Sequence, residues 1–250
     1  MQASLLVELL TEELPPKSLA RLANAFAQGV FSGLAAHQLK LRVPDQRAFA
    51  TPRRIGVFVP NVEERAADRE DVQAGPSEKA SPAAIAGFAK KHGLAVETLE
   101  RQETPKGTVV TARIKIPGAN LDSVLAGIVA EALRKLPIPK VMRWGDGDAQ
   151  FVRPVHKLVM MHGSRVVPGA VLGLASGNTT RGHRFMGSGD ITLANVDEYA
   201  ARLRNEGKVV ADFAERKSMI DVALLAQAGK AGATMGDYAD LLDEVTALVE

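Results

Sequence analysis

The chain has 250 residues, of which 46% are hydrophobic and 24% are charged, with no cysteine and a formal net charge of +2. These values are typical of a globular protein of one or two domains, and the absence of cysteine excludes disulfides and thiolate metal sites. The sequence neither opens with a secretion signal nor contains an apolar stretch near the roughly 18 residues of a membrane span. We therefore expect a cytoplasmic protein that makes no contact with a membrane.

Residues 1–65 predict a β-α-β unit. The apolar run at 4–10, SLLVELL, is typical of a buried strand, and apolar residues recur every three or four positions over 19–34, as on one face of a helix. The alternating pattern at 47–62 predicts a returning strand. Residues 63–79 are rich in charge and contain a Gly-Pro pair, so a linker or an exposed crossing is expected there.

The next segment predicts a helix, a strand and a second helix. Ser81 followed by proline is a typical helix start, and Gly93 supplies a stop. Residues 108–116 alternate apolar and polar side chains, as in a half-buried antiparallel strand. Asn120 can cap a helix over 121–136, whose apolar stripe faces a core.

The remaining elements are shorter or less regular. Strands are expected at 155–162, 166–174 and 191–193, the first two paired through a turn, and helices at 195–207, 212–228 and 238–248. The sequence stops at Val249-Glu250, directly after this helix and without a cap or a polar tail, so we expect the chain to be part of something longer. The pattern as a whole predicts an α+β fold with a mixed, mostly antiparallel sheet and packed helices. The expected domains are 1–65 and 66–250.

Positive charge is concentrated between Pro139 and Met186, where seven basic residues face only two acidic ones, Asp146 and Asp148. The same stretch holds the only tryptophan and three of the five histidines, among glycines and prolines. Loops of this kind commonly carry binding groups. Arginine can donate two parallel hydrogen bonds to a phosphate, and an aromatic ring can stack on an unpaired base. The candidate RNA-binding residues are Arg53, Arg54, Lys140, Arg143, Trp144, Arg153, His183 and Arg184.

A structural interpretation of the same residues stays open. Trp144 can be a core or interface anchor, and Arg153 and Arg184 can pair with carboxylates of the chain itself. The two aspartates are too few for a hard-cation site. His156 and His162 lie on one predicted strand, about 20 Å apart at roughly 3.3 Å per residue, which is too far to share a metal.

The usual catalytic motifs are missing from the sequence. It contains neither G-x-x-x-x-G-K-[ST] nor G-x-G-x-x-G after a strand, and no G-x-S-x-G nucleophile elbow. We therefore predict no catalytic residue and no metal ligand in this chain.

Six blocks occur in one order: LLVELLTEELPPK, ATPRRIGVFV, PKVMRWG, FVRPVHKLVMMHG, GNTTRGHRF and VVADFAERK. Together they resemble the N-terminal part of the beta subunit of bacterial glycyl-tRNA synthetase, the heterotetrameric type. The resemblance covers essentially the whole chain. Lys157 departs from the pattern, because the family usually has tryptophan at this position of its FVRP-x-H block.

The resemblance implies a subunit that handles tRNA-Gly in an α2β2 complex, with glycine, ATP and magnesium held by a separate alpha subunit. This chain alone is then expected to bind no cofactor and to be non-catalytic. The resemblance also implies further domains, namely an HD-type domain, helical parts and an anticodon-binding domain, which are not in this sequence.

The region is also similar to the B3/B4 domain of the phenylalanyl enzyme's beta subunit, where that domain edits. No editing residue can be matched one by one. Three functions therefore stay open: a tRNA-contacting module of a ligase, a structural module that joins alpha to beta, and an editing-like domain.

Overall fold

The structure, a computed structural model, describes residues 1–40, 44–105, 107–138 and 140–250. Pro139, at the start of the basic stretch, lies outside the described residues. Within these ranges, no helix combines the length and the apolar character that a membrane crossing needs.

The chain divides into two compact units. The first combines residues 1–65 with residues 119–250, and the second consists of residues 66–118. This division differs from the expected one at 1–65 and 66–250, because a strand from the second half of the chain pairs with the N-terminal strand. Hydrogen bonding between distant segments therefore joins what the sequence suggested were separate domains.

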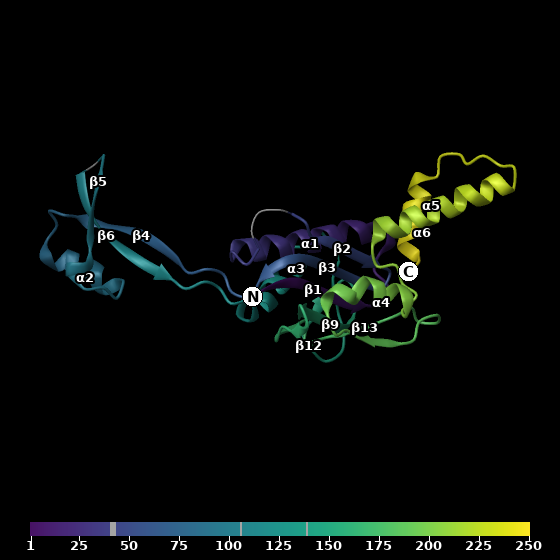
Figure 1. Ribbon diagram of the computed structural model, residues 1–250, viewed down its shortest axis with the longest axis horizontal. Helices are drawn as coiled ribbons and strands as arrows, with labels where there is room; N and C mark the ends of the chain where they lie inside the picture. Colours follow the sequence, from purple (N-terminus) through teal and green to yellow (C-terminus); the bar gives the residue numbers. More distant parts are fainter. Residues whose placement is uncertain (41–43, 106, 139) are drawn as a thin grey trace. The chain divides into compact units, whose positions relative to one another are not determined.

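A seven-stranded sheet forms the centre of the first unit, in the order β11-β12-β9-β1-β3-β2, with β10 also paired to β9. Figure 1 labels β1, β2, β3, β9 and β12 of this sheet. Its strands are β1 (Gln2–Thr11), β2 (Arg47–Thr51), β3 (Arg54–Glu63), β9 (Val155–His162), β10 (Arg165–Val166), β11 (Ala170–Val171) and β12 (Leu174–Gly177). All neighbouring strands are antiparallel except β12 and β9, which are parallel. The predicted α+β class with a mostly antiparallel sheet is confirmed.

Strand β1 lies in the middle of this sheet and is buried on both faces. Its residues from Leu5 to Thr11 are all buried, which explains why the sequence there is a continuous apolar run rather than an alternating one. The exception in that run is Glu8, a charged side chain with 0% exposure. A buried charge of this kind needs a partner, and the partner lies on β3.

Two helices pack against each other beside the sheet. α1 (Leu19–Ala36) contacts β2 and β3, and it also contacts α3 (Leu121–Arg134). Gly29 and Gly33 of α1 make the close approach possible, because a Cβ on Gly33 would lie 2.4 Å from Cγ2 of Ile128. The predicted cap of α3 is confirmed, since the Asn120 side chain accepts a hydrogen bond from the backbone N–H of Asp122.

The opposite face of the sheet is covered by the segment after β9. This segment contains β13 (Thr179–Arg181), β14 (Asp190–Thr192), the 3-10 turn η3 (Val196–Glu198) and α4 (Tyr199–Asn205). Its apolar residues join Leu6 of β1 and Val159 of β9 in one buried cluster. The hairpin β13–β14 therefore lies against the sheet and is fixed by a hydrophobic contact.

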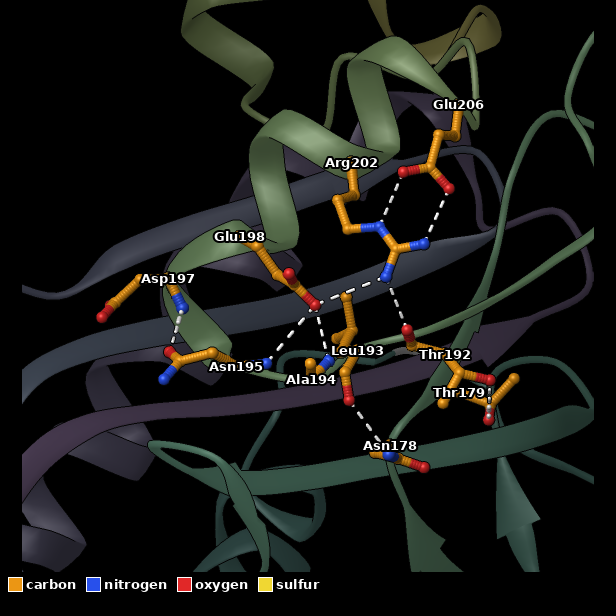
Figure 2. A network of polar contacts seen from close by, with 10 residues as sticks. All are labelled: Asn178, Thr179, Thr192, Leu193, Ala194, Asn195, Asp197, Glu198, Arg202 and Glu206. Carbon is orange, nitrogen blue, oxygen red and sulfur yellow. Dashed lines mark hydrogen bonds and ion pairs between the residues drawn. The ribbon is translucent and has the colours of Figure 1, made fainter.

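Figure 2 shows the polar network that fixes the base of this hairpin. The Asn178 side chain donates to the carbonyl of Leu193 at 3.0 Å, and Arg202 donates to the carbonyl of Thr192 at 2.6 Å. Arg202 also donates to both carboxylate oxygens of Glu206, the residue that follows α4. Glu198 accepts from the backbone N–H groups of residues 194 and 195, and the first of these bonds is the main cause that lowers its pKa.

The last two helices, α5 (Phe213–Lys230) and α6 (Ala239–Leu248), contact each other. Arg216 attaches them to the sheet, because its guanidinium donates to the carbonyls of Ala50 and Thr246 at 2.8 and 3.1 Å. Burial lowers the pKa of Arg216 to about 10. A two-stranded ribbon, β7 (Met142–Arg143) with β8 (Gln150–Phe151), precedes β9.

The second unit is a three-stranded antiparallel sheet in the order β4-β6-β5 with one helix. Its elements are β4 (Arg69–Ser77), α2 (Pro82–Lys91), the 3-10 turn η2 (Val96–Thr98), β5 (Glu100–Thr104) and β6 (Gly107–Ile116). The helix predicted from Ser81 and the strand predicted at 108–116 are both confirmed.

Three sequence-based expectations were wrong. Residues 63–79 were expected to be a linker, but β4 occupies 69–77, and its Gly-Pro pair sits at a shift in the register with β6, where a proline is tolerated. Residues 47–62 form two strands, because the chain reverses at Pro52–Arg53. Only 165–166 pairs back on β9, and β12 then returns parallel to it.

Candidate functional site

A pocket of about 290 Å³ lies at one edge of the first unit's sheet. We call it the basic pocket, and its lining residues are Leu10, Thr11, Glu12, Arg53, Arg54, His156, Lys157, Arg181, Gly182, Arg184 and Glu250. The register explains why distant segments meet here. Leu10 at the end of β1 pairs with Arg54 at the start of β3, and Thr11 pairs with Val155 at the start of β9.

Two cations in the basic pocket share one carboxylate. Lys157 Nζ lies 2.5 Å from Oδ2 of Asp190, and Arg181 Nε lies 2.6 Å from Oδ1 of the same residue. The hydrogen bond from Lys157, followed by that from Arg181, lowers the pKa of Asp190 below its usual range. One negative charge opposes two positive ones, so this corner retains a positive charge for an external anion.

The other polar groups of the pocket form pairs. His156 Nε2 lies 2.8 Å from Oε1 of Glu12, and Arg53 Nη2 lies 3.3 Å from Oε2 of Glu250. These contacts connect the end of β1 with β9, and the β2–β3 turn with residue 250. They hold the walls of the pocket and reduce the charge that Arg53 offers to a ligand.

Arg54 lies under the pocket and is internal. Its side chain is 1% exposed, and it donates to Glu8 Oε2 at 3.0 Å and to the carbonyl of Arg181 at 2.7 Å. Burial opposes its charge, but the carboxylate of Glu8 raises the pKa of Arg54 above the ordinary value. In the fold, this buried arginine balances a buried glutamate and holds β13 in place, and its contact with RNA stays a prediction.

Arg184 differs from the other cations of the pocket. Among the residues that the structure describes it makes no ion pair, and its guanidinium carbon lies 5.8 Å from the ring centroid of Phe185. Its side chain is exposed. The neighbouring His183 faces the loop itself, because its Nδ1 accepts hydrogen bonds from the backbone N–H groups of Phe185 and Met186.

The remaining predicted residues are placed elsewhere. Lys140 and Arg143 are exposed, Trp144 is half-buried, and all three belong to the region of the β7–β8 ribbon. Arg143 makes one long contact of 3.8 Å with the exposed Asp148. Arg153 donates to the backbone carbonyls of residues 13 and 152 rather than to a carboxylate.

Of the predicted residues that the structure describes, Arg53, Arg54 and Arg184 thus line the basic pocket. Three further lining residues, His156, Lys157 and Arg181, were not among the predicted binding residues. Lys157 and Arg181 do belong to the basic stretch 139–186, so the composition of the sequence indicated the region in which they lie. The pairing of β9 with β1 brings Lys157 to this end of the sheet, and the hydrogen bond from Arg54 to the carbonyl of Arg181 brings β13 there.

The arrangement can hold an anion with two or more oxygens. Guanidinium groups match phosphate and carboxylate with two parallel hydrogen bonds, and Lys157 adds a point charge. The described residues include no group of three His, Asp or Glu side chains arranged to hold a metal ion.

Comparison with known proteins gives one consistent result. Residues 5–250 match the family described as "Glycyl-tRNA synthetase beta subunit". The chain is 51% identical over 259 residues to a glycine–tRNA ligase beta subunit of Aromatoleum aromaticum, covering 99% of this chain and 37% of that relative. It is 47% identical to the one of Neisseria meningitidis serogroup B and 43% identical to that of Serratia proteamaculans, covering 37% of each. The chain thus spans little more than a third of the relatives it matches.

Proposed function

Because the chain belongs to the glycyl-tRNA synthetase beta-subunit family, we propose that it is the N-terminal, tRNA-handling region of a glycine–tRNA ligase beta subunit. The complete ligase attaches glycine to tRNA-Gly with ATP. Its partner is an alpha subunit in an α2β2 complex of the cytoplasm, and that alpha subunit holds ATP and magnesium.

The observation that carries the tRNA proposal is the surplus of positive charge in the basic pocket. Lys157 and Arg181 share Asp190, and Arg184 has no ion pair among the described residues. Phosphates of an RNA backbone are the anions that such cations attract most strongly, because each contact releases counterions. The tRNA backbone therefore contacts this edge of the sheet.

The experiment measures binding of tRNA-Gly to the assembled alpha–beta complex at several salt concentrations. Arg181→Ala and Arg184→Ala should each weaken binding and reduce the slope of log affinity against log salt by about 1 for one lost phosphate contact. Arg134→Ala is the matched control, since Arg134 is an exposed arginine of α3 that pairs with Glu131 on its own helix. Affinity and slope unchanged in both pocket variants would refute the proposal.

Two further variants define the extent of the contact. Arg143→Ala and Arg153→Ala test the region of the β7–β8 ribbon, which does not line the basic pocket. A smaller slope of log affinity against log salt for Arg143→Ala would indicate that Arg143 contacts a second phosphate. Loss of alpha–beta assembly in the pocket variants, with tRNA affinity of the remaining beta subunit intact, would favour the structural role instead.

The chain alone is proposed to lack glycine activation, since its sequence contains no phosphate-binding loop. Purified chain free of alpha subunit should show no glycine-dependent exchange of pyrophosphate into ATP. Full-length beta mixed with alpha should charge tRNA-Gly. Exchange by the chain alone would overturn this part of the proposal.

A further inference from the structure

Among the residues that the structure describes, Phe185 is the most exposed large apolar side chain after the N-terminal Met1. It is 85% exposed and its neighbour Met186 is 62% exposed. Both lie at the tip of the loop 182–189, which connects β13 to β14 and begins at the wall of the basic pocket. At this exposure the ring of Phe185 contributes little to the core, and Phe185 and Met186, two exposed apolar neighbours in sequence, form one small patch beside the basic pocket.

The loop that carries Phe185 is fixed by its backbone. The N–H of Gly182 donates to the carbonyl of Gly189 at 2.9 Å, and that of His183 donates to the carbonyl of Gly207 at 2.7 Å. Nδ1 of His183 accepts from the N–H groups of Phe185 and Met186 at 3.1 and 3.2 Å.

Gly182 and Gly207 allow the backbone of this loop to pack closely against the backbone that follows α4. A Cβ on Gly182 would lie 2.5 Å from Cα of Gly207, so neither wall can carry a side chain there. The network of Figure 2 anchors the same hairpin at its base through residues 178 and 192. The backbone that carries Phe185 is therefore already ordered. A ligand that binds the ring does not have to pay the entropy of ordering this loop.

The surroundings of the ring favour a nucleic acid base. Arg184 lies 5.8 Å from the ring centroid and lines the basic pocket, so an aromatic face and a phosphate-binding group are adjacent. Bases of single-stranded or unpaired RNA stack on such aromatic rings while cations track their phosphates. Phenylalanine, methionine and arginine are also enriched in protein–protein interfaces, so a protein partner is the alternative occupant that the test has to separate from a base.

We propose that Phe185 is a stacking platform for an unpaired base of tRNA whose adjoining phosphate lies at Arg184 in the basic pocket. This inference rests on the proposed function and adds the kind of nucleotide bound: one outside a helix, with a free face. The base stacks on the ring, and Met186 borders it. Stacking recognises the face of a base and is tolerant of its identity.

The test uses the assembled alpha–beta complex and tRNA-Gly, with affinity measured over a range of salt concentrations. Phe185→Ala should weaken binding about 5- to 150-fold while the salt dependence stays as in the parent, because no counterion is released by stacking. Phe185→Tyr should restore the affinity, since the aromatic face is kept. Phe185→Leu, which keeps the apolar volume but not the face, should remain weak.

Three outcomes decide the matter. Parent-like affinity for Phe185→Ala, together with a reduced salt slope for Arg184→Ala, would overturn the stacking inference and leave the phosphate contact standing. Full recovery by Phe185→Leu, or loss of the alpha–beta complex in Phe185→Ala, would assign the ring to a protein contact and also overturn it. Met186→Ala is the matched control in the same loop, and its effect should be small beside that of Phe185→Ala.

Discussion

The guanidinium of Arg54 lies 3.0 Å from the carboxylate of Glu8 inside the central sheet, where the two side chains are 1% and 0% exposed. Tyr199 of α4 donates a hydrogen bond to the same carboxylate oxygen, and burial followed by the charge of Glu8 raises the pKa of Tyr199 well above its usual range. One buried carboxylate thus connects β1, β3 and α4. Arg54 extends this connection to β13, below the basic pocket.

Replacing one partner of this pair should be costly. Arg54→Met leaves the Glu8 carboxylate buried without its cation, and the free energy of unfolding should fall by about 3–5 kcal/mol. Urea denaturation measures this, with Arg134→Ala at an exposed pair as the control that changes little. Glu8→Leu combined with Arg54→Met should recover much of the loss. A single variant as stable as the parent would show that the pair does not hold the sheet.

The contact of α1 with α3 predicts opposite effects for two similar substitutions. Gly33→Ala places a Cβ 2.4 Å from Ile128 and should destabilise, although alanine is the better helix former. Gly127→Ala adds a Cβ with nothing within 4 Å, so it should stabilise by about 0.5–1 kcal/mol. Thermal midpoints of the two variants test the difference. A raised thermal midpoint in both variants would mean that α1 and α3 can move apart to make room for the added Cβ.

Leu125 tests whether the apolar stripe of α3 belongs to the core. It is fully buried, so Leu125→Ala should lower the free energy of unfolding by about 2–5 kcal/mol. Val124→Ala on the same helix removes fewer atoms from a half-exposed site and should cost less. Equal denaturation midpoints for Leu125→Ala and the parent would show that this face of α3 is not packed in the core.

Asp190 predicts a dependence of stability on acid pH. Lys157, and then Arg181, hold the pKa of Asp190 below its ordinary value of 3.8, so its folded value is lower than its unfolded one. Its contribution to stability is therefore complete above pH 3.8 and is lost as the pH falls through the lower, folded value.

Asp190→Asn should accordingly lower the urea midpoint at neutral pH, and the gap to the parent should close in the acid range. Asp148→Asn is the control, because Asp148 is fully exposed and its contact with Arg143 is 3.8 Å long. A gap that is the same at every pH would mean that the charge of Asp190 is not what stabilises the hairpin.

Much of the fold was predictable because the signals are local. Asn120 caps α3 and Ser81 caps α2 through their own side chains, and the alternation at 108–116 reflects one exposed face of a sheet. The strand β4 was missed because its sequence is charged, and its order comes from hydrogen bonds to β6. No local pattern reveals such pairing.

The candidate site was predictable only in part. The basic stretch was visible as composition, but Arg53 is separated from Arg184 by more than a hundred positions, and only the folded chain brings both to one pocket. Phe185 was not singled out, since exposure cannot be read from residue type. Glu8 stands in the apolar run at 5–10, but its partner Arg54 could be identified only from the pairing of β1 with β3.

The sequence by itself determined the family, the α+β class and most element types, because these depend on residue order and on periodicities of two and 3.6. The tertiary structure alone decided which cations serve the fold and which face outward. Arg54 and Arg184 carry the same charge, yet one is held against Glu8 under the sheet and the other stands beside an exposed ring. Desolvation and the nearest opposite charge make that difference, and both depend on neighbours that are distant in the chain.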